Sequence, residues 1–218
     1  MPTPTSGTNI GQGINKITGT NDALAANVSS TTKLLQTTRW RVVSAATAGS
    51  SVLFGDISFR KVAMCRDFTS YFMFANEDAE TVANARMFCG YYSAATVSNV
   101  DPSTLTNLIG VGADTGDTQL QIIHNDSFGL ATKIALGVNF PANTNTDFYI
   151  VKFEFLTSGS VRITVGNLDN GASSITTVST NIDGETTRYY PILWRNNGST
   201  ALAVRMSLIH WSLIRNSY

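Results

Sequence analysis

The triplet His124-Asn125-Asp126 has the residue types of acid–base chemistry, because a histidine beside a carboxylate can exchange protons with a substrate. It follows Thr118 to Ile123, which we expect to be a strand, where neighbouring side chains point to opposite faces. The sequence has no G-x-S-x-G nucleophile motif and no H-E-x-x-H zinc motif. We therefore expect a polar turn after a strand, with the histidine bonded to backbone, and we interpret His210 beside Trp211 in the same way.

A second polar segment, Gly110 to Asp117, offers glycines for a phosphate cradle and carboxylates for calcium. A dinucleotide site needs such glycines between a strand and a helix, but no helix-forming sequence follows, and a P-loop lysine is missing. An EF-hand loop would need regularly spaced oxygen ligands and a terminal glutamate. We expect a glycine-rich turn capped by aspartates and no cofactor, with Asp114 and Asp117 as secondary candidates for a bound cation.

Three acidic residues, Glu77, Asp78 and Glu80, lie close together in one connection. A glycosidase needs two carboxylates about 5–10 Å apart across a groove, one of them desolvated. A polar connection instead indicates a solvated loop. We therefore expect a protein that is not an enzyme, with a polysaccharide hydrolase as an alternative.

Sugar binding by a β-sandwich uses an aromatic side chain that stacks on the apolar face of a pyranose, with polar groups for the hydroxyls. Two places combine these residue types: the end of the segment 86–92 and the turn that begins at Trp194. Aromatic residues in a sandwich are more often part of the core, so both interpretations stay open. The candidate ligand-binding residues are Tyr91, Tyr92, Trp194, Arg195, Asn196 and Asn197.

These residues need a scaffold, and after Trp40 short apolar runs alternate with clusters of turn residues, a pattern typical of sandwiches and barrels. Phe148 to Phe155 alternates apolar and polar residues, and Val161 to Val165 follows after a turn, which predicts a β-hairpin. Further strands are expected at 40–46, 52–59, 68–74, 86–92, 118–123, 175–180, 189–194 and 202–208. The sequence thus predicts an all-β fold, an antiparallel two-sheet β-sandwich of jelly-roll type.

Residues 1–38 are rich in Thr, Ser, Asn, Gly and Ala and contain no aromatic residue. We expect a polar N-terminal attachment or linker arm at 1–38, followed by one sandwich domain at 39–218. Within the arm, Asn21-Asp22 could cap a short helix that runs through Leu24 and Val28.

The charge and the cysteines restrict the class of protein further. Fifteen basic and 15 acidic residues balance, so we expect no nucleic-acid partner. No apolar run has the length of a membrane span, and the N-terminus lacks the blocks of a secretory signal, so we expect assembly in a cytosol. Cys65 and Cys89 lack the spacing of a zinc site and predict free thiols in buried strands.

The stretch Ser103 to Pro141, reading STLTNLIGVGADTGDTQLQIIHNDSFGLATKIALGVNFP, is similar to bacteriophage structural proteins of the tail-fibre and head-fibre type. RNNGSTALAV, Arg195 to Val204, resembles their closing hairpin, and with FGDISFRKV and ARMFCGYYS the likeness covers about Val52 to Trp211. The resemblance implies a fibre or decoration subunit of the capsid or tail on a virion surface, associated as a homotrimer. Contact with other virion proteins is expected through the N-terminal arm. The alternative is a receptor-binding module for a host-surface polysaccharide.

Overall fold

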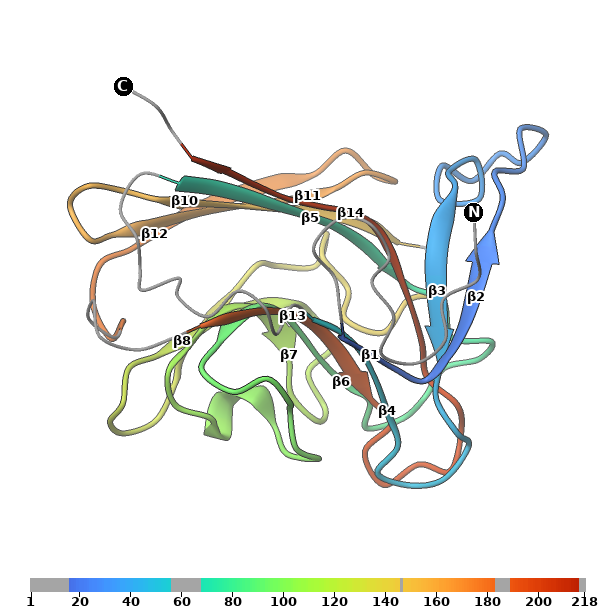
Figure 1. Cartoon of the computed structure of the whole chain (residues 1–218), viewed down its shortest axis with the longest axis horizontal. Helices are drawn as coiled ribbons and strands as arrows, with labels where there is room; N and C mark the ends of the chain where they lie inside the picture. The colour runs from blue at the N-terminus through green and yellow to red at the C-terminus, as the bar shows by residue number, and fades with distance from the viewer. Residues whose placement is uncertain (1–15, 56–67, 146, 183–188, 216–218) are drawn as a thin grey trace.

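The computed structural model describes residues 16–55, 68–145, 147–182 and 189–215, which form two facing antiparallel sheets (Figure 1). Sheet A contains, in order, β1 (Lys16–Thr18), β4 (Ser51–Gly55), β13 (Tyr190–Asn196), β6 (Arg86–Tyr92), β7 (Leu108–Ala113), β8 (Gln121–Asn125) and β9 (Thr132–Ala135). Sheet B contains β12 (Ser173–Val178), β11 (Val161–Asn167), β10 (Phe148–Phe155), β5 (Phe68–Asn76), β14 (Arg205–Arg215), β3 (Arg39–Val43) and β2 (Thr20–Leu24). The predicted two-sheet β-sandwich is confirmed.

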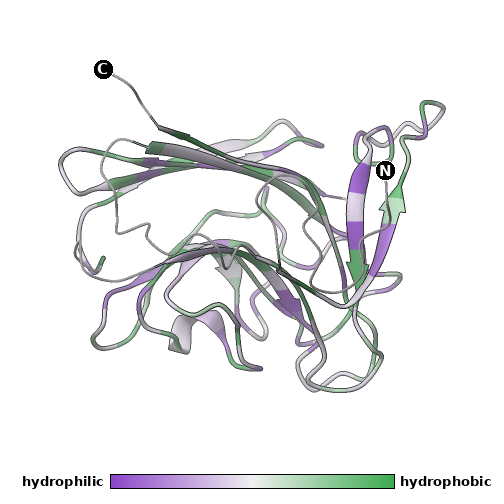
Figure 2. Ribbon diagram, viewed as in Figure 1, coloured by the Kyte–Doolittle hydropathy of each residue, from purple (hydrophilic) through white to green (hydrophobic). Residues whose placement is uncertain are grey.

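The hairpin of β10 and β11 forms as its sequence pattern predicts. Along β10, Val151 and Phe153 are buried whereas Lys152 and Glu154 are partly exposed, because successive side chains of a strand point to opposite faces. The turn between the two strands contains Gly159 at a φ of +82°, a conformation that glycine adopts without a steric penalty. Figure 2 shows hydrophobic residues along the strands of both sheets.

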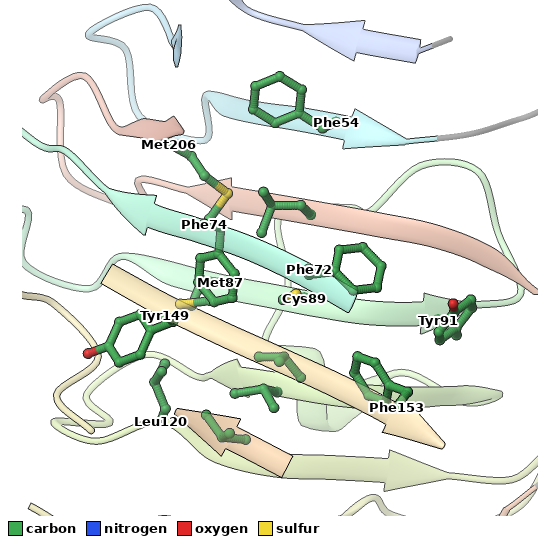
Figure 3. Packing of buried hydrophobic residues seen from close by; sticks show 14 of the residues in the cluster. Phe54, Phe72, Phe74, Met87, Cys89, Tyr91, Leu120, Tyr149, Phe153 and Met206 are labelled. Atoms are coloured by element: carbon green, nitrogen blue, oxygen red, sulfur yellow. The ribbon is translucent and has the colours of Figure 1, made fainter. Parts of the chain in front are cut away.

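Aromatic side chains from the two sheets meet in the interior (Figure 3). Tyr91 of β6 packs edge-on against Phe72 of β5 and Phe153 of β10, with ring centroids 6.0 and 5.6 Å apart. Such pairs contribute about 0.5–1.5 kcal/mol beyond the burial of their area. The thiol of Cys89 is free and lies in the same core, as predicted, and its burial raises its pKa. Cys65 lies outside the described residues.

A second apolar cluster covers the outer face of sheet A, which points away from sheet B. Phe88 of β6 and Trp194 of β13 are register partners there and are fully buried. The connection between β6 and β7, residues 93–107, packs over them through Val97 and Leu105 and includes the short 3-10 helix η1 (Pro102–Thr104). This connection lies below sheet A in Figure 1. The outer face of sheet A is therefore filled by the protein itself.

The described part of the N-terminal arm belongs to the sandwich. β1 pairs with β4 in sheet A, and β2 pairs with β3 in sheet B. The expectation of a helix after Asn21 is wrong, because residues 20–24 gain the backbone hydrogen bonds of a sheet edge instead. Leu34 is also buried, in a small cluster on sheet B. Residues 16–38 are therefore not a linker separate from the domain.

Some strand boundaries agree with the predicted ones and others differ. β6 and β10 have the predicted limits, whereas β14 continues well beyond the predicted end at Leu208 and includes His210, which we had placed in a turn. β7 was missed, because its sequence LIGVGA was interpreted as part of a glycine-rich turn. Within the described ranges, no helix has the length and apolar character needed to cross a bilayer.

Candidate functional site

The loop that joins β8 to β9, residues 126–131, presents two apolar side chains to solvent. Phe128 is 79 % exposed and Leu130 is 85 % exposed. Large apolar side chains are normally withdrawn from water, so two of them on one six-residue loop form a candidate contact surface.

Hydrogen bonds within the loop fix its shape. The Asp126 Oδ1 atom accepts a bond of 2.7 Å from the backbone N–H of Phe128, which closes an Asx turn. At the base, Asn125 Nδ2 donates to the carbonyl oxygens of Leu105 and Gly129, at 2.9 and 3.3 Å. The backbone of the loop at Phe128 is therefore held in a defined position before any ligand arrives, which lowers the entropic cost of ordering the loop on binding.

Asn181, from the segment after β12, supports the loop from its other side. Its Oδ1 accepts from the Asp126 N–H at 3.2 Å, and its Nδ2 donates to the Thr132 hydroxyl at 3.0 Å and to the His124 carbonyl at 3.3 Å. His124 Nδ1 lies 3.1 Å from the Asn181 carbonyl oxygen. As predicted, His124 is bonded to backbone, although it lies inside β8 and the turn begins only at Asp126.

The polar groups around Phe128 are mostly hydrogen-bond acceptors. The amide oxygens of Asn107 and Asn125 are buried and have no hydrogen-bond partner among the described residues. Asp126, whose carboxylate bonds the Phe128 backbone N–H, is partly exposed. An exposed aromatic ring can stack on the apolar side of a sugar, and a carboxylate two residues away can accept bonds from its hydroxyl groups.

The glycan residues expected from the sequence are placed elsewhere. They do not form an exposed aromatic platform, because their side chains point either into the interior or to the covered outer face of sheet A. Of the six, Tyr92 alone is partly exposed. The five that are buried, each 0–1 % exposed, are Tyr91, Trp194, Arg195, Asn196 and Asn197. Asn196 and Asn197 instead bond to the backbone of Gly49 and Thr47, at 3.0 and 2.8 Å.

Asp114 and Asp117, the secondary cation candidates, share one ammonium group. Lys133 Nζ lies 2.7 Å from the Asp114 carboxylate and 2.6 Å from that of Asp117. Although partial burial acts against its charge, the hydrogen bonds and negative charges of both aspartates raise the pKa of Lys133. Among the described residues, no group of three or more His, Cys, Asp or Glu side chains could hold a metal ion.

The acidic connection after β5 is not the solvated loop that we expected. Glu77 and Asp78 are buried, and each pairs with an arginine, Arg39 and Arg195 respectively. A buried carboxylate needs such a partner because leaving water is costly for a charge. Glu80 alone is exposed.

Two other carboxylates, Asp147 and Asp169, lie near the start of β10. Asp147 Oδ2 accepts from the Tyr149 hydroxyl at 2.9 Å, and Asp169 Oδ2 accepts from the Phe148 N–H at 2.6 Å. Partial burial and the negative charge of Asp147 raise the pKa of Asp169. A carboxyl group with a raised pKa near a second carboxylate is one feature of a glycoside hydrolase active site.

The two-sheet sandwich is a fold that the chain shares with several solved structures. The chain is similar to lectin UEA-II complexed with galactose, with a TM-score of 0.54, 15 % identity and coverage of 94 % of this chain and 95 % of that one. Alginate lyase A1-II′, a member of polysaccharide lyase family 7, gives a TM-score of 0.55 at 12 % identity, covering 83 % and 81 % of the two chains.

A carbohydrate esterase from the Shiga toxin-encoding bacteriophage phi24B is also similar. It has a TM-score of 0.51 and 12 % identity, with coverage of 93 % of this chain and 90 % of that one. At such identities the likeness shows the fold. No family model and no curated protein sequence matches the chain.

Proposed function

We propose that this chain is a non-enzymatic carbohydrate-recognition module that binds a sugar at the loop 126–131. The observation that carries the proposal is Phe128, which is highly exposed yet held by the Asx turn of Asp126. A loop whose backbone is already fixed loses little conformational freedom when a sugar stacks on the ring, and the partly exposed Asp126 carboxylate favours a ligand with hydroxyl groups. The proposal is supported by analogy with a sugar-binding protein of similar fold, lectin UEA-II.

We further propose that the module is a surface subunit of a bacteriophage virion, in a fibre or decoration of the capsid or tail. Support comes from the resemblance of Ser103 to Pro141 and of 195–204 to tail-fibre and head-fibre proteins. In this proposal the chain assembles as a homotrimer, contacts other virion proteins through its N-terminal region, and meets a host-surface polysaccharide. Light scattering of the purified chain and its location in an electron-microscopy map of the particle test these assignments.

The sugar site is tested by glycan-array binding of the full chain and of Phe128→Ala. We expect the variant to bind its best glycan at least about tenfold more weakly, because the burial of a phenylalanine side chain contributes about 1.5–3 kcal/mol. Val138→Ala is a matched control, since Val138 is 78 % exposed on a different loop. Equal losses in both variants would contradict the site. Absence of glycan binding by the parent chain would favour a decoration subunit without a sugar ligand.

A polysaccharide hydrolase is the second candidate, because of Asp147 and the raised pKa of Asp169. In that case Asp169 would act as the general acid, a role that a raised carboxyl pKa favours. The release of reducing ends from host polysaccharide by the parent chain, and its loss in Asp169→Asn, would favour this function over recognition alone.

A further inference from the structure

A cavity of about 210 Å³ lies on the outer side of sheet B, at the end opposite to β12. It forms where the connection between β2 and β3 folds back, with Leu34 and Leu35 as one wall. Arg39 and Arg41 of β3 line the cavity. Successive side chains of a strand point to opposite faces, and the alternate residues Trp40 and Val42 pack against the core. Figure 2 shows the first part of β3 as hydrophilic.

The cavity lining has more cationic than anionic groups: Arg39 and Arg41 face a single carboxylate, Glu77. Arg39 pairs closely with Glu77 through Nε. The other contacts of this carboxylate are long, 3.4 Å from Arg39 Nη2 and 3.5 Å from Arg41 Nη1, against about 2.7–3.2 Å for a well-formed bond. Arg39 Nη1 donates to the carbonyl oxygens of Leu34 and Thr37, at 3.4 and 3.2 Å, so the more weakly bonded donor is Nη1 of Arg41.

Asp22 of β2 offsets the charge of Arg41 only partly. Its carboxylate lies 2.5 Å from Arg41 Nη2, but its side chain is 46 % exposed and its charge is screened by solvent. Arg41 itself is only 24 % exposed, and its Nε has no hydrogen-bond partner within the described part of the chain. Arg41 Nη1, which has only the long contact with Glu77, is therefore left as a donor for an anion that enters the cavity, an arrangement that favours a carboxylate.

We propose that this cavity binds the carboxylate of an acidic sugar, a single uronate unit. Its volume is below the roughly 300–1,000 Å³ of sites for drug-sized ligands, which suits one ring. Leu34 and Leu35 supply an apolar wall, and Asn145 and Thr32 supply polar groups for ring hydroxyls. The proposal rests on the proposed function for the choice of a sugar, but it uses none of the residues of the loop 126–131.

Titration of the full chain with sodium glucuronate, followed by calorimetry, tests the cavity, with glucose and acetate as comparison ligands. We expect glucuronate to bind, acetate to bind more weakly, glucose to give no heat at the same concentrations, and added salt to weaken glucuronate binding. Arg41→Gln should weaken glucuronate binding at least about tenfold, because charge-assisted bonds are lost. Arg162→Gln is the matched control, since Arg162 lies at 45 % exposure on the other half of the same sheet.

Leu35→Trp is a second variant, which narrows the cavity without changing its charge and replaces a side chain that is 39 % exposed. It should also weaken glucuronate binding. The proposal would be overturned if the parent chain gave no heat of glucuronate binding. It would also be overturned if Arg41→Gln and Arg162→Gln bound glucuronate equally well. Phe128→Ala should leave glucuronate binding unchanged, so that failure of the loop site and failure of the cavity give different results.

Discussion

Arg195 of β13 and Asp78, just after β5, form an ion pair between the two sheets, with side chains 0 % and 3 % exposed. Arg195 Nε lies 3.1 Å from Asp78 Oδ2, and the other carboxylate oxygen accepts a bond of 2.6 Å from the backbone N–H of Arg205. Arg195 Nη2 also reaches Asn143 Oδ1 at 3.3 Å. One buried carboxylate therefore connects sheet A with β14 of sheet B.

Removal of one partner should be costly, because it leaves an uncompensated charge in the interior. We expect Arg195→Met to lower the free energy of unfolding by about 3–5 kcal/mol, measured by urea denaturation. Arg162→Met, on the solvent side of β11, should change it by less than about 0.5 kcal/mol. A similar small effect of both substitutions would show that the buried pair contributes little.

Gly110 of β7 allows the aromatic ring of Phe88 to lie against the backbone. A Cβ atom at this position would lie 2.6 Å from the Phe88 ring and 2.5 Å from the Cys89 carbonyl oxygen, closer than atoms can approach. Gly110→Ala should therefore destabilise the fold by about 1–3 kcal/mol, measured by thermal or chemical denaturation. A variant as stable as the parent chain would contradict this packing.

The carboxylate of Asp101 anchors the connection 93–107. Partial burial acts to raise its pKa, but hydrogen bonds from Thr115 and Arg86, together with the charge of Arg86, lower it overall. The stabilisation is thus present above the unfolded value of about 3.8 and is lost as the pH falls through the lower, folded value. Asp101→Asn should cost less than about 1 kcal/mol at pH 7, since the pair is partly exposed, and should flatten the acid limb of a stability–pH curve.

Asp169 should have the opposite pH dependence. Because burial and the charge of Asp147 raise its pKa, the folded state binds the proton more tightly, and stability falls as the pH rises from about 3.8 through the folded value. Asp169→Asn keeps an acceptor for the Phe148 N–H and should raise stability at pH 7 by less than about 1 kcal/mol. The gain should vanish below about pH 3.8. A gain that persists in acid would point to another cause.

The sheets could be predicted wherever one face of a strand is apolar and the other polar, as in β10 and β11. β7 could not, because Gly110 and Gly112 take the outward positions where polar residues would mark a strand. Glycine is needed at both positions because Phe88 and the Met87 carbonyl oxygen, which are distant in sequence, pack too closely to leave room for a Cβ atom. Such a requirement becomes visible only when the strand neighbours are known.

The candidate site was missed for a related reason. The sequence places its candidate sugar-binding aromatic residues at strand ends, but Tyr91 and Trp194 occupy the interior and the covered face of sheet A. Nothing in the strand pattern says that the connection 93–107 folds over that face. A signal for Phe128 did exist, since Asp126-Ser127-Phe128-Gly129 places one aromatic residue inside a sequence typical of a tight turn.

The covered face of sheet A also limits how this molecule can meet a polymer. Leu105 and Val97 occupy the space over Phe88 and Trp194 where a long chain would otherwise lie across the strands. If the two proposed sites bind sugar units, an extended ligand would contact the loop 126–131 or the cavity beside β3, and would not lie across the strands of sheet A. Selectivity would then depend on the units that reach these two separate points of contact and on the spacing between them.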